Sequence, residues 1–196
     1  MFYKLNKDFY FHTYYDGLDL NIEMNITCLL KLNGFKNYPQ VEYSQILEAV
    51  NTIYQHERKI VDLGCGTGLL LNYIINNHSR TLIPYGIDFI EQSIAIAQHI
   101  FNGFKNNFFI SNATDIESIN IDLNDSIILL DPYHYLQSDL HKIINYCKSF
   151  RCRVLLYTYS DVLNILEIDD IKSFVIDLDL PCIYSHKHDL IQIYVV

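Results

Sequence analysis

Apolar residues along this chain gather in short continuous runs, which alternate with segments where apolar residues recur at helical spacing. Five such runs of four to seven largely apolar residues lie at 60–63, 82–88, 107–111, 126–131 and 151–157. Such runs are typical of strands buried on both faces of a parallel sheet. The helical segments between them cover 69–75, 91–104 and 140–150. This alternation predicts an α/β fold with a mostly parallel sheet flanked by helices.

The two ends of the chain follow different patterns. Segments 174–178 and 190–196 alternate apolar and polar residues, which predicts a final pair of strands joined through 185–189. Before residue 58, helical spacing at 20–32 and 46–53 predicts two helices. We therefore expect a helical cap over 1–57, followed by a sheet domain over 58–196, in one compact unit.

Three glycines separate the first strand from the helix that follows it. Gly64, Gly66 and Gly68 stand at every second position, directly before the apolar residues of that helix. A helix N-terminus carries free backbone N–H groups, and glycines let a ligand lie against the chain. A dinucleotide fingerprint would need a further glycine where Leu69 stands, and a phosphate loop would need Lys and Ser or Thr. The spacing therefore favours another nucleoside ligand.

The pattern Asp62-x-Gly64-x-Gly66-x-Gly68 resembles the first motif of the class I S-adenosylmethionine (SAM)-dependent methyltransferases. The resemblance implies a Rossmann-like fold with strand order 3-2-1-4-5-7-6 and strand 7 antiparallel. It implies SAM as cofactor and S-adenosylhomocysteine as product. The loop, including Cys65, would wrap the methionine half of SAM, and Asp62 would help to hold its ammonium group.

The next two strands end in further cofactor candidates. Asp88, 20 residues beyond Gly68, ends the second strand, where an acid accepts hydrogen bonds from ribose hydroxyls. The resemblance assigns Asp88 that role and places Phe89 near the adenine; alternatively, Asp88 only caps the next helix. Asn112 stands where relatives carry an acid. Its amide oxygen would accept from the adenine amino group, and the N–H of Ala113 would donate to the ring.

The fourth strand leads to the catalytic candidates Asp131, Tyr133 and His134. In one interpretation, His134 opens a helix, as in small-molecule methyltransferases, and is the general base for an acceptor hydroxyl. In the other, Asp131-Pro132-Tyr133 resembles the Asp-Pro-Pro-Tyr box of enzymes that methylate the amino groups of nucleobases, with one proline missing. A histidine that only begins a helix is a third possibility for His134.

The aromatic stretch at 9–15 is open to two interpretations. In many small class I methyltransferases such a segment closes over the cofactor and the acceptor. Otherwise its rings cover the edge of the sheet.

The composition of the chain argues against several classes of partner and cofactor. The formal charge is −9 and we find no cluster of Lys and Arg, so a nucleic-acid partner is not expected. Five cysteines without a Cys-x-x-Cys pair indicate neither disulfides nor zinc, and we assign no metal. The sequence shows neither a membrane-spanning apolar run nor a signal peptide, which favours a cytoplasmic protein. We expect methyl transfer to oxygen or nitrogen of a small molecule. The alternatives are nucleobase methylation and an inactive SAM-binding module.

Overall fold

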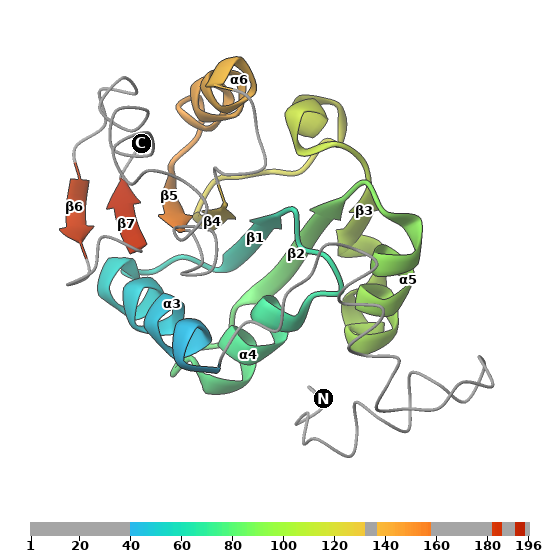
Figure 1. The fold of residues 1–196 in the computed structure, drawn as a ribbon, viewed down its shortest axis with the longest axis horizontal. Helices are drawn as coiled ribbons and strands as arrows, with labels where there is room; N and C mark the ends of the chain where they lie inside the picture. The colour runs from blue at the N-terminus through green and yellow to red at the C-terminus, as the bar shows by residue number, and fades with distance from the viewer. Residues whose placement is uncertain (1–39, 132–136, 158–181, 186–190, 195–196) are drawn as a thin grey trace.

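The computed structural model describes residues 40–131, 137–157, 182–185 and 191–194. Five parallel strands form most of its sheet, in the order β3-β2-β1-β4-β5 (Figure 1). The predicted α/β class and this parallel order are confirmed. The strands are β1 (Lys59–Leu63), β2 (Ile83–Asp88), β3 (Phe108–Ile110), β4 (Ser126–Leu130) and β5 (Cys152–Tyr157).

Two short strands continue the sheet beyond β5. β7 (Ile191–Tyr194) pairs antiparallel with β5, and β6 (Cys182–Ser185) pairs antiparallel with β7. The segment 174–178, where we expected the sixth strand, lies outside the described residues. The described partner of β7 is instead the stretch that begins at Cys182.

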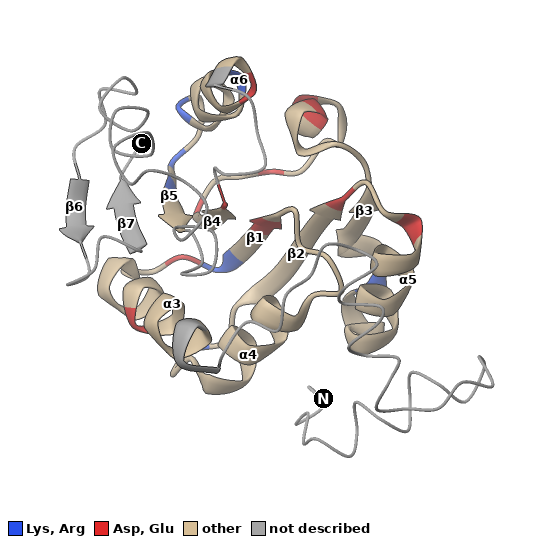
Figure 2. Cartoon of the chain, viewed as in Figure 1, with Lys and Arg blue, Asp and Glu red and all other residues tan. Residues whose placement is uncertain are grey.

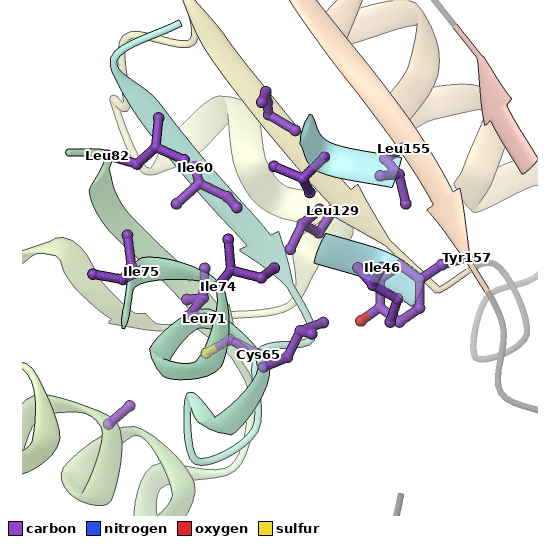
Figure 3. Close-up of a cluster of buried hydrophobic side chains, with 14 of the residues drawn as sticks. Ile46, Ile60, Cys65, Leu71, Ile74, Ile75, Leu82, Leu129, Leu155 and Tyr157 are labelled. Carbon is purple, nitrogen blue, oxygen red and sulfur yellow. The ribbon is translucent and has the colours of Figure 1, made fainter. Parts of the chain in front are cut away.

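Helices cover both faces of the sheet and give a three-layer arrangement (Figure 1). Side chains alternate along the strands: Ile60 joins one buried cluster, whereas Val61 joins the other. α3, α4 and α5 pack on the first face, part of which Figure 3 shows, and α6 and η2 pack on the second. The helices are α3 (Gln40–Ile53), α4 (Leu69–Asn77), α5 (Glu91–Ile100), η1 (Asn102–Asn107), η2 (Ala113–Ser118) and α6 (Gln137–Cys147).

The helix expected over 91–104 ends earlier than predicted. α5 stops at Ile100, and the short 3-10 helix η1 follows it. The Phe104 N–H donates to the Phe101 carbonyl at 2.6 Å, which tightens the chain at this point. Asn102 and Gly103 are poor helix formers, so the α-helical ladder does not continue through them.

The helix predicted at 46–53 is confirmed as part of α3, which begins at Gln40. It lies against α4, β5 and β7. Its apolar residues Ile46, Ala49, Val50 and Ile53 belong to the same buried cluster as Ile60 of β1. This helix therefore closes one face of the sheet. Within the described residues, no helix is long and apolar enough to cross a membrane.

Pro84 lies inside β2, although prolines are uncommon in central strands. The Ile83 N–H donates to the carbonyl of Arg58, the residue before β1, at 2.8 Å. Because successive residues of a strand face opposite neighbours, the nitrogen of Pro84 faces the β3 side. Pairing with β3 begins only at Gly86, so no ladder hydrogen bond is lost at Pro84.

A buried ion pair links the end of α3 to β5. Arg153 Nε lies 2.9 Å from Glu57 Oε1, and the Glu57 side chain is 6% exposed. Glu57 Oε2 also accepts from the backbone N–H groups of Gln55 and His56, at 2.7 and 3.1 Å. Arg153 Nη1 donates to the carbonyl of Ile53, the last residue of α3. Arg153 therefore neutralises a buried acid and caps a helix.

We expect Arg153→Met to lower the free energy of unfolding by about 3–5 kcal/mol, because it leaves Glu57 as a buried charge without its partner. Urea unfolding followed by circular dichroism measures this loss. The matched control is Arg151→Met, which removes the pair between Arg151 Nη2 and Asp125 Oδ1 from a side chain that is 75% exposed. A surface pair of this kind contributes about 0–1 kcal/mol. Equal losses in the two variants would contradict the assigned role of Arg153.

Candidate functional site

Three carboxylates meet at the carboxyl edge of the sheet. Asp62 of β1 pairs in register with Gly86 of β2 and Leu129 of β4. Asp88 and Asp131 therefore lie two positions further along those neighbouring strands, on either side of β1. Asp62 is 1% exposed, and Asp88 and Asp131 are each 6% exposed. Figure 2 shows acidic residues at the carboxyl ends of β1 and β2, with basic Lys59 at the opposite end of β1.

The glycine loop begins directly after β1 and has left-handed backbone geometry at each glycine. The φ angles of Gly64, Gly66 and Gly68 are 86°, 52° and 78°. A side chain is disfavoured at such angles, which explains the three glycines. The N–H groups of Gly64 and Cys65 both donate to Ile87 of β2, at 2.8 and 3.0 Å. The loop is thus fastened to β2 on its way to α4.

The side chain of Asp88, the last residue of β2, also binds the glycine loop. Its Oδ2 accepts from the Gly66 N–H at 2.8 Å, and its Oδ1 accepts from the Ile90 N–H at 2.8 Å. The second bond reaches the residue just before α5, so the alternative role at the helix start is present in part. Each carboxylate oxygen keeps a further lone pair for a ligand hydroxyl. The predicted ribose contact therefore stays open beside a structural role that the sequence did not reveal.

Asp62 is the least satisfied of the three acids. Its Oδ1 is buried and has no hydrogen-bond partner among the described residues. Burial, followed by the charges of Asp88 and Asp131, raises the pKa of Asp62 to about 8, while a side-chain hydrogen bond with Tyr157 lowers it. Buried polar atoms without partners are rare in native proteins. An orphan acidic oxygen among other acids suits a cationic group of a ligand.

Cys65 sits in a space that depends on a glycine of β2. A Cβ at Gly86 would lie 2.6 Å from Cys65 Sγ and 2.6 Å from Phe108 Cδ1. Gly86 was not among the predicted site residues, although a glycine inside an apolar strand often marks the close approach of another chain segment. Burial raises the pKa of the Cys65 thiol well above its usual range, so the thiol stays protonated. A protonated thiol is a poor nucleophile, and the Cys65 side chain fills the space that Gly86 leaves beside β2.

Two large apolar side chains are exposed at the same edge. Phe89 is 73% exposed and Ile110 is 56% exposed. Ile110 pairs in register with Asp88, the residue before Phe89, so both lie at the carboxyl ends of β2 and β3. An exposed ring and an aliphatic side chain beside a ribose-binding acid suit the faces of a planar base. The sequence predicted Phe89 here but missed Ile110, which its pattern does not distinguish from a core residue.

By sequence, the chain matches no known family model and no curated protein. By structure, it matches many solved proteins. A magnesium protoporphyrin IX methyltransferase from Synechocystis PCC 6803 with bound SAM has a TM-score of 0.51 and 15% identity, covering 96% of this chain and 92% of that one. Fibrillarin from Aeropyrum pernix with bound SAM has a TM-score of 0.53 and 12% identity, covering 79% and 76%. An O-methyltransferase of neocarzinostatin biosynthesis, in complex with SAM and 2-hydroxy-5-methyl naphthoic acid, has a TM-score of 0.57 and 14% identity, covering 79% and 52%.

The chain has the fold of the SAM-dependent methyltransferases. In this methyltransferase fold, the three acids, the glycine loop and Phe89 lie at the carboxyl edge of the parallel strands. Ligands of open α/β sheets bind outside that edge.

Asn112 has a structural task at the same edge of the methyltransferase fold. Its Oδ1 accepts from the Thr114 N–H at 3.1 Å and so caps η2. Asp115 lies inside η2, and its Oδ1 is 3.8 Å from Lys142 Nζ. Ala113 is 5% exposed. The adenine contacts of Asn112 and Ala113 stay predictions.

Of the three predicted catalytic residues, the structure describes only Asp131. Asp131 lies in the acidic cluster, and its charge helps to raise the pKa of Asp62. Tyr133 and His134 lie outside the described residues. The geometry therefore unites Asp62, Asp88 and Asp131 and leaves the general base as a prediction.

Proposed function

We propose that this protein transfers a methyl group from SAM to an oxygen or nitrogen of a small-molecule acceptor. The observation that carries the proposal is the unpartnered, buried Oδ1 of Asp62, which lies among acids beside a loop of three glycines with positive φ. SAM carries an ammonium group and a sulfonium, and both are attracted to an acidic cluster. The fold shared with SAM-bound methyltransferases supports the same ligand.

In this proposal, each part of the cofactor is assigned to residues at the carboxyl edge of the sheet. Asp62 would hold the ammonium group, and the loop with Cys65 would lie along the methionine half. Asp88 would accept from the ribose hydroxyls with the lone pairs that Gly66 and Ile90 leave open. Phe89 and Ile110 would pack on the adenine. Asn112 and Ala113 would make its polar contacts, with the Asn112 amide group still able to bond a base edge.

Methyl transfer from SAM depends more on how the acceptor is positioned than on reactive side chains. SAM supplies a methyl group that is already activated on a sulfonium. The chain must align the acceptor with that methyl group and exclude water, and alignment alone contributes several kcal/mol, up to about 7–11 kcal/mol in favourable cases. His134 would take the proton of an acceptor hydroxyl, and Asp131 and Tyr133 would orient the acceptor.

A small-molecule acceptor is supported by the charge of the chain. A net charge of −9 and an acidic sheet edge repel phosphate backbones, which nucleic-acid enzymes attract with Lys and Arg. The described cysteines Cys65, Cys147 and Cys152 are free, as expected of the reducing cytosol that we propose as its location. We also assign the acceptor pocket to the predicted cap at 1–57 and to the loops at this edge, because such loops carry specificity in α/β folds.

Two measurements test the proposal. Titration calorimetry should detect binding of SAM and of S-adenosylhomocysteine, and no binding of NAD⁺. The enzyme, incubated with methyl-tritiated SAM and a cell extract, should place the label in the small-molecule fraction. S-adenosylhomocysteine should form in equal amount.

The possible outcomes are distinct. Binding of NAD⁺ in place of SAM would overturn the cofactor assignment. SAM binding without product in any fraction would favour the inactive module. Label in RNA or DNA would favour the nucleobase enzyme and the role of Asp131-Pro132-Tyr133 in it.

A further inference from the structure

Among the described residues, every group that interacts with the Asp62 carboxyl group is acidic or neutral. Asp88 faces it from β2, Asp131 from the end of β4, Cys65 from the glycine loop and Tyr157 from β5. No lysine or arginine contributes to its surroundings, and no ion pair involves Asp62 among the described residues. The ligand-free site therefore holds three buried carboxyl groups with no described positive charge to balance them.

We propose that Asp62 and Tyr157 form a proton-releasing receptor for the amino group of the ligand: Asp62 is neutral in the empty site and gives its proton to solvent when an ammonium group docks, while Tyr157 positions the carboxylate. This inference rests on the proposed function, since it takes SAM as the ligand. It adds a new residue, Tyr157, and a proton that is coupled to binding.

The empty site keeps the proton because ionising Asp62 would bring a third negative charge into a buried cluster. Burial and the neighbouring acids raise the pKa of Asp62 to about 8, so the neutral form dominates at pH 7. A docked ammonium group supplies the missing positive charge within contact distance of Oδ1. The ionised form then becomes the favoured one, and the proton leaves to the buffer.

Tyr157 acts on the carboxyl group of Asp62 and need not touch the ligand. It is 5% exposed and reaches Asp62 from β5, across the intervening strand β4. Its side-chain hydrogen bond lowers the pKa of Asp62 and so favours the ionised form. Because Oδ1 has no partner, Tyr157 leaves that oxygen to the ligand. It is a positioning residue for the ammonium subsite.

The test is calorimetric titration of the full chain with SAM at pH 6.5 in phosphate and in imidazole, buffers with different ionisation enthalpies. The difference between the observed enthalpies counts the protons exchanged. We expect release of about one proton per SAM bound, because an acid of pKa near 8 is almost fully protonated at this pH. The control ligand is 5′-methylthioadenosine, which has the adenosine part but no amino acid. It should bind with no proton release.

The affinity for SAM should follow pH in a defined way. Below about pH 7, the affinity for SAM should increase by roughly tenfold for each unit by which the pH is raised, because removing the proton from Asp62 then costs less free energy. Near pH 8 it should pass through a maximum, because the ligand's own α-amino group loses its proton at about 7.7–8.0. The affinity for 5′-methylthioadenosine should be nearly flat over the same range.

Three variants separate positioning from simple structural damage. Asp62→Asn should abolish proton release on SAM binding and flatten the pH profile. Tyr157→Phe should shift the rising limb of the profile to higher pH, because it removes the bond that lowers the Asp62 pKa. Asp131→Asn should shift the same limb to lower pH, because it removes a repelling charge. A purely structural role for Tyr157 would weaken all ligands equally and leave the profile in place.

The outcomes keep this inference apart from the proposed function. If SAM does not bind at any pH, the proposed function fails. If SAM binds with no proton release, or with equal release from 5′-methylthioadenosine, the inference is overturned and the proposed function stands. Opposite shifts in Tyr157→Phe and Asp131→Asn support the inference even if Asp62→Asn does not fold.

Discussion

Asp88→Ala is expected to lower the affinity for SAM by at least about 100-fold and the free energy of unfolding by about 3–6 kcal/mol, because each of its two bonds from backbone N–H groups to a charged carboxylate contributes about 1.5–3 kcal/mol. The side chain accepts from the N–H groups of Gly66 and Ile90, both at 2.8 Å. Alanine leaves both donors without their acceptor and removes the tie between Gly66 and β2, although Gly64 and Cys65 still donate to the Ile87 carbonyl. It also removes the proposed ribose contact, so stability and binding fall together.

Asp88→Asn separates the two roles of this residue. Its single amide oxygen accepts from one backbone N–H but not from both, and its nitrogen accepts nothing. We expect stability between that of the wild type and Asp88→Ala, with affinity close to the alanine variant. Calorimetry with SAM and urea unfolding give the two quantities. The control is Glu117→Ala, since Glu117 is 58% exposed and its pair with Lys142 spans 3.6 Å. An unchanged SAM affinity in Asp88→Ala would count against the ribose assignment.

The elements that could be predicted from the sequence are those determined by residues close together along the chain. Strands that are buried on both faces of the sheet are rich in consecutive apolar residues. The ends of β1, β4 and β5 could therefore be predicted to within a residue or two. A left-handed turn needs glycine, so the loop after β1 could be recognised from Gly64, Gly66 and Gly68. Asp88 could be placed at a strand end because its run stops there.

Features that depend on a distant partner escaped the sequence. Cys65 of the glycine loop approaches Gly86 of β2 closely, and the sequence pattern around either residue does not indicate the other as its neighbour. The raised pKa of Asp62 comes from burial and from acids on two neighbouring strands, and the role of Tyr157 appears only when β5 has been placed. The ring of Phe101, directly after α5, also stacks on Phe108 of β3 with ring centroids 4.9 Å apart, a contact that the sequence does not reveal.

Gly66→Val should remove measurable SAM binding, with an affinity loss of more than about 1,000-fold, which corresponds to roughly 4 kcal/mol. The φ angle of Gly66 is 52°, a conformation that a β-branched residue adopts only under strain. Strain of this kind costs of the order of 1–3 kcal/mol. Relief of the strain would turn the Gly66 N–H away from Asp88 Oδ2, and the new side chain would occupy the surface where the methionine half of SAM is expected to lie.

The matched control for Gly66→Val is Gly103→Val. A Cβ at Gly103 would meet no atom within 4 Å, and Gly103 does not have a positive φ angle. Its substitution should leave SAM affinity unchanged and stability within about 0.5 kcal/mol of the wild type, as for other exposed positions. Calorimetry on both variants decides the matter, with circular dichroism to verify folding. A folded Gly66→Val that still binds SAM tightly would mean that the ligand does not lie against this loop, whereas equal losses in both variants would mean that the effect comes from valine itself.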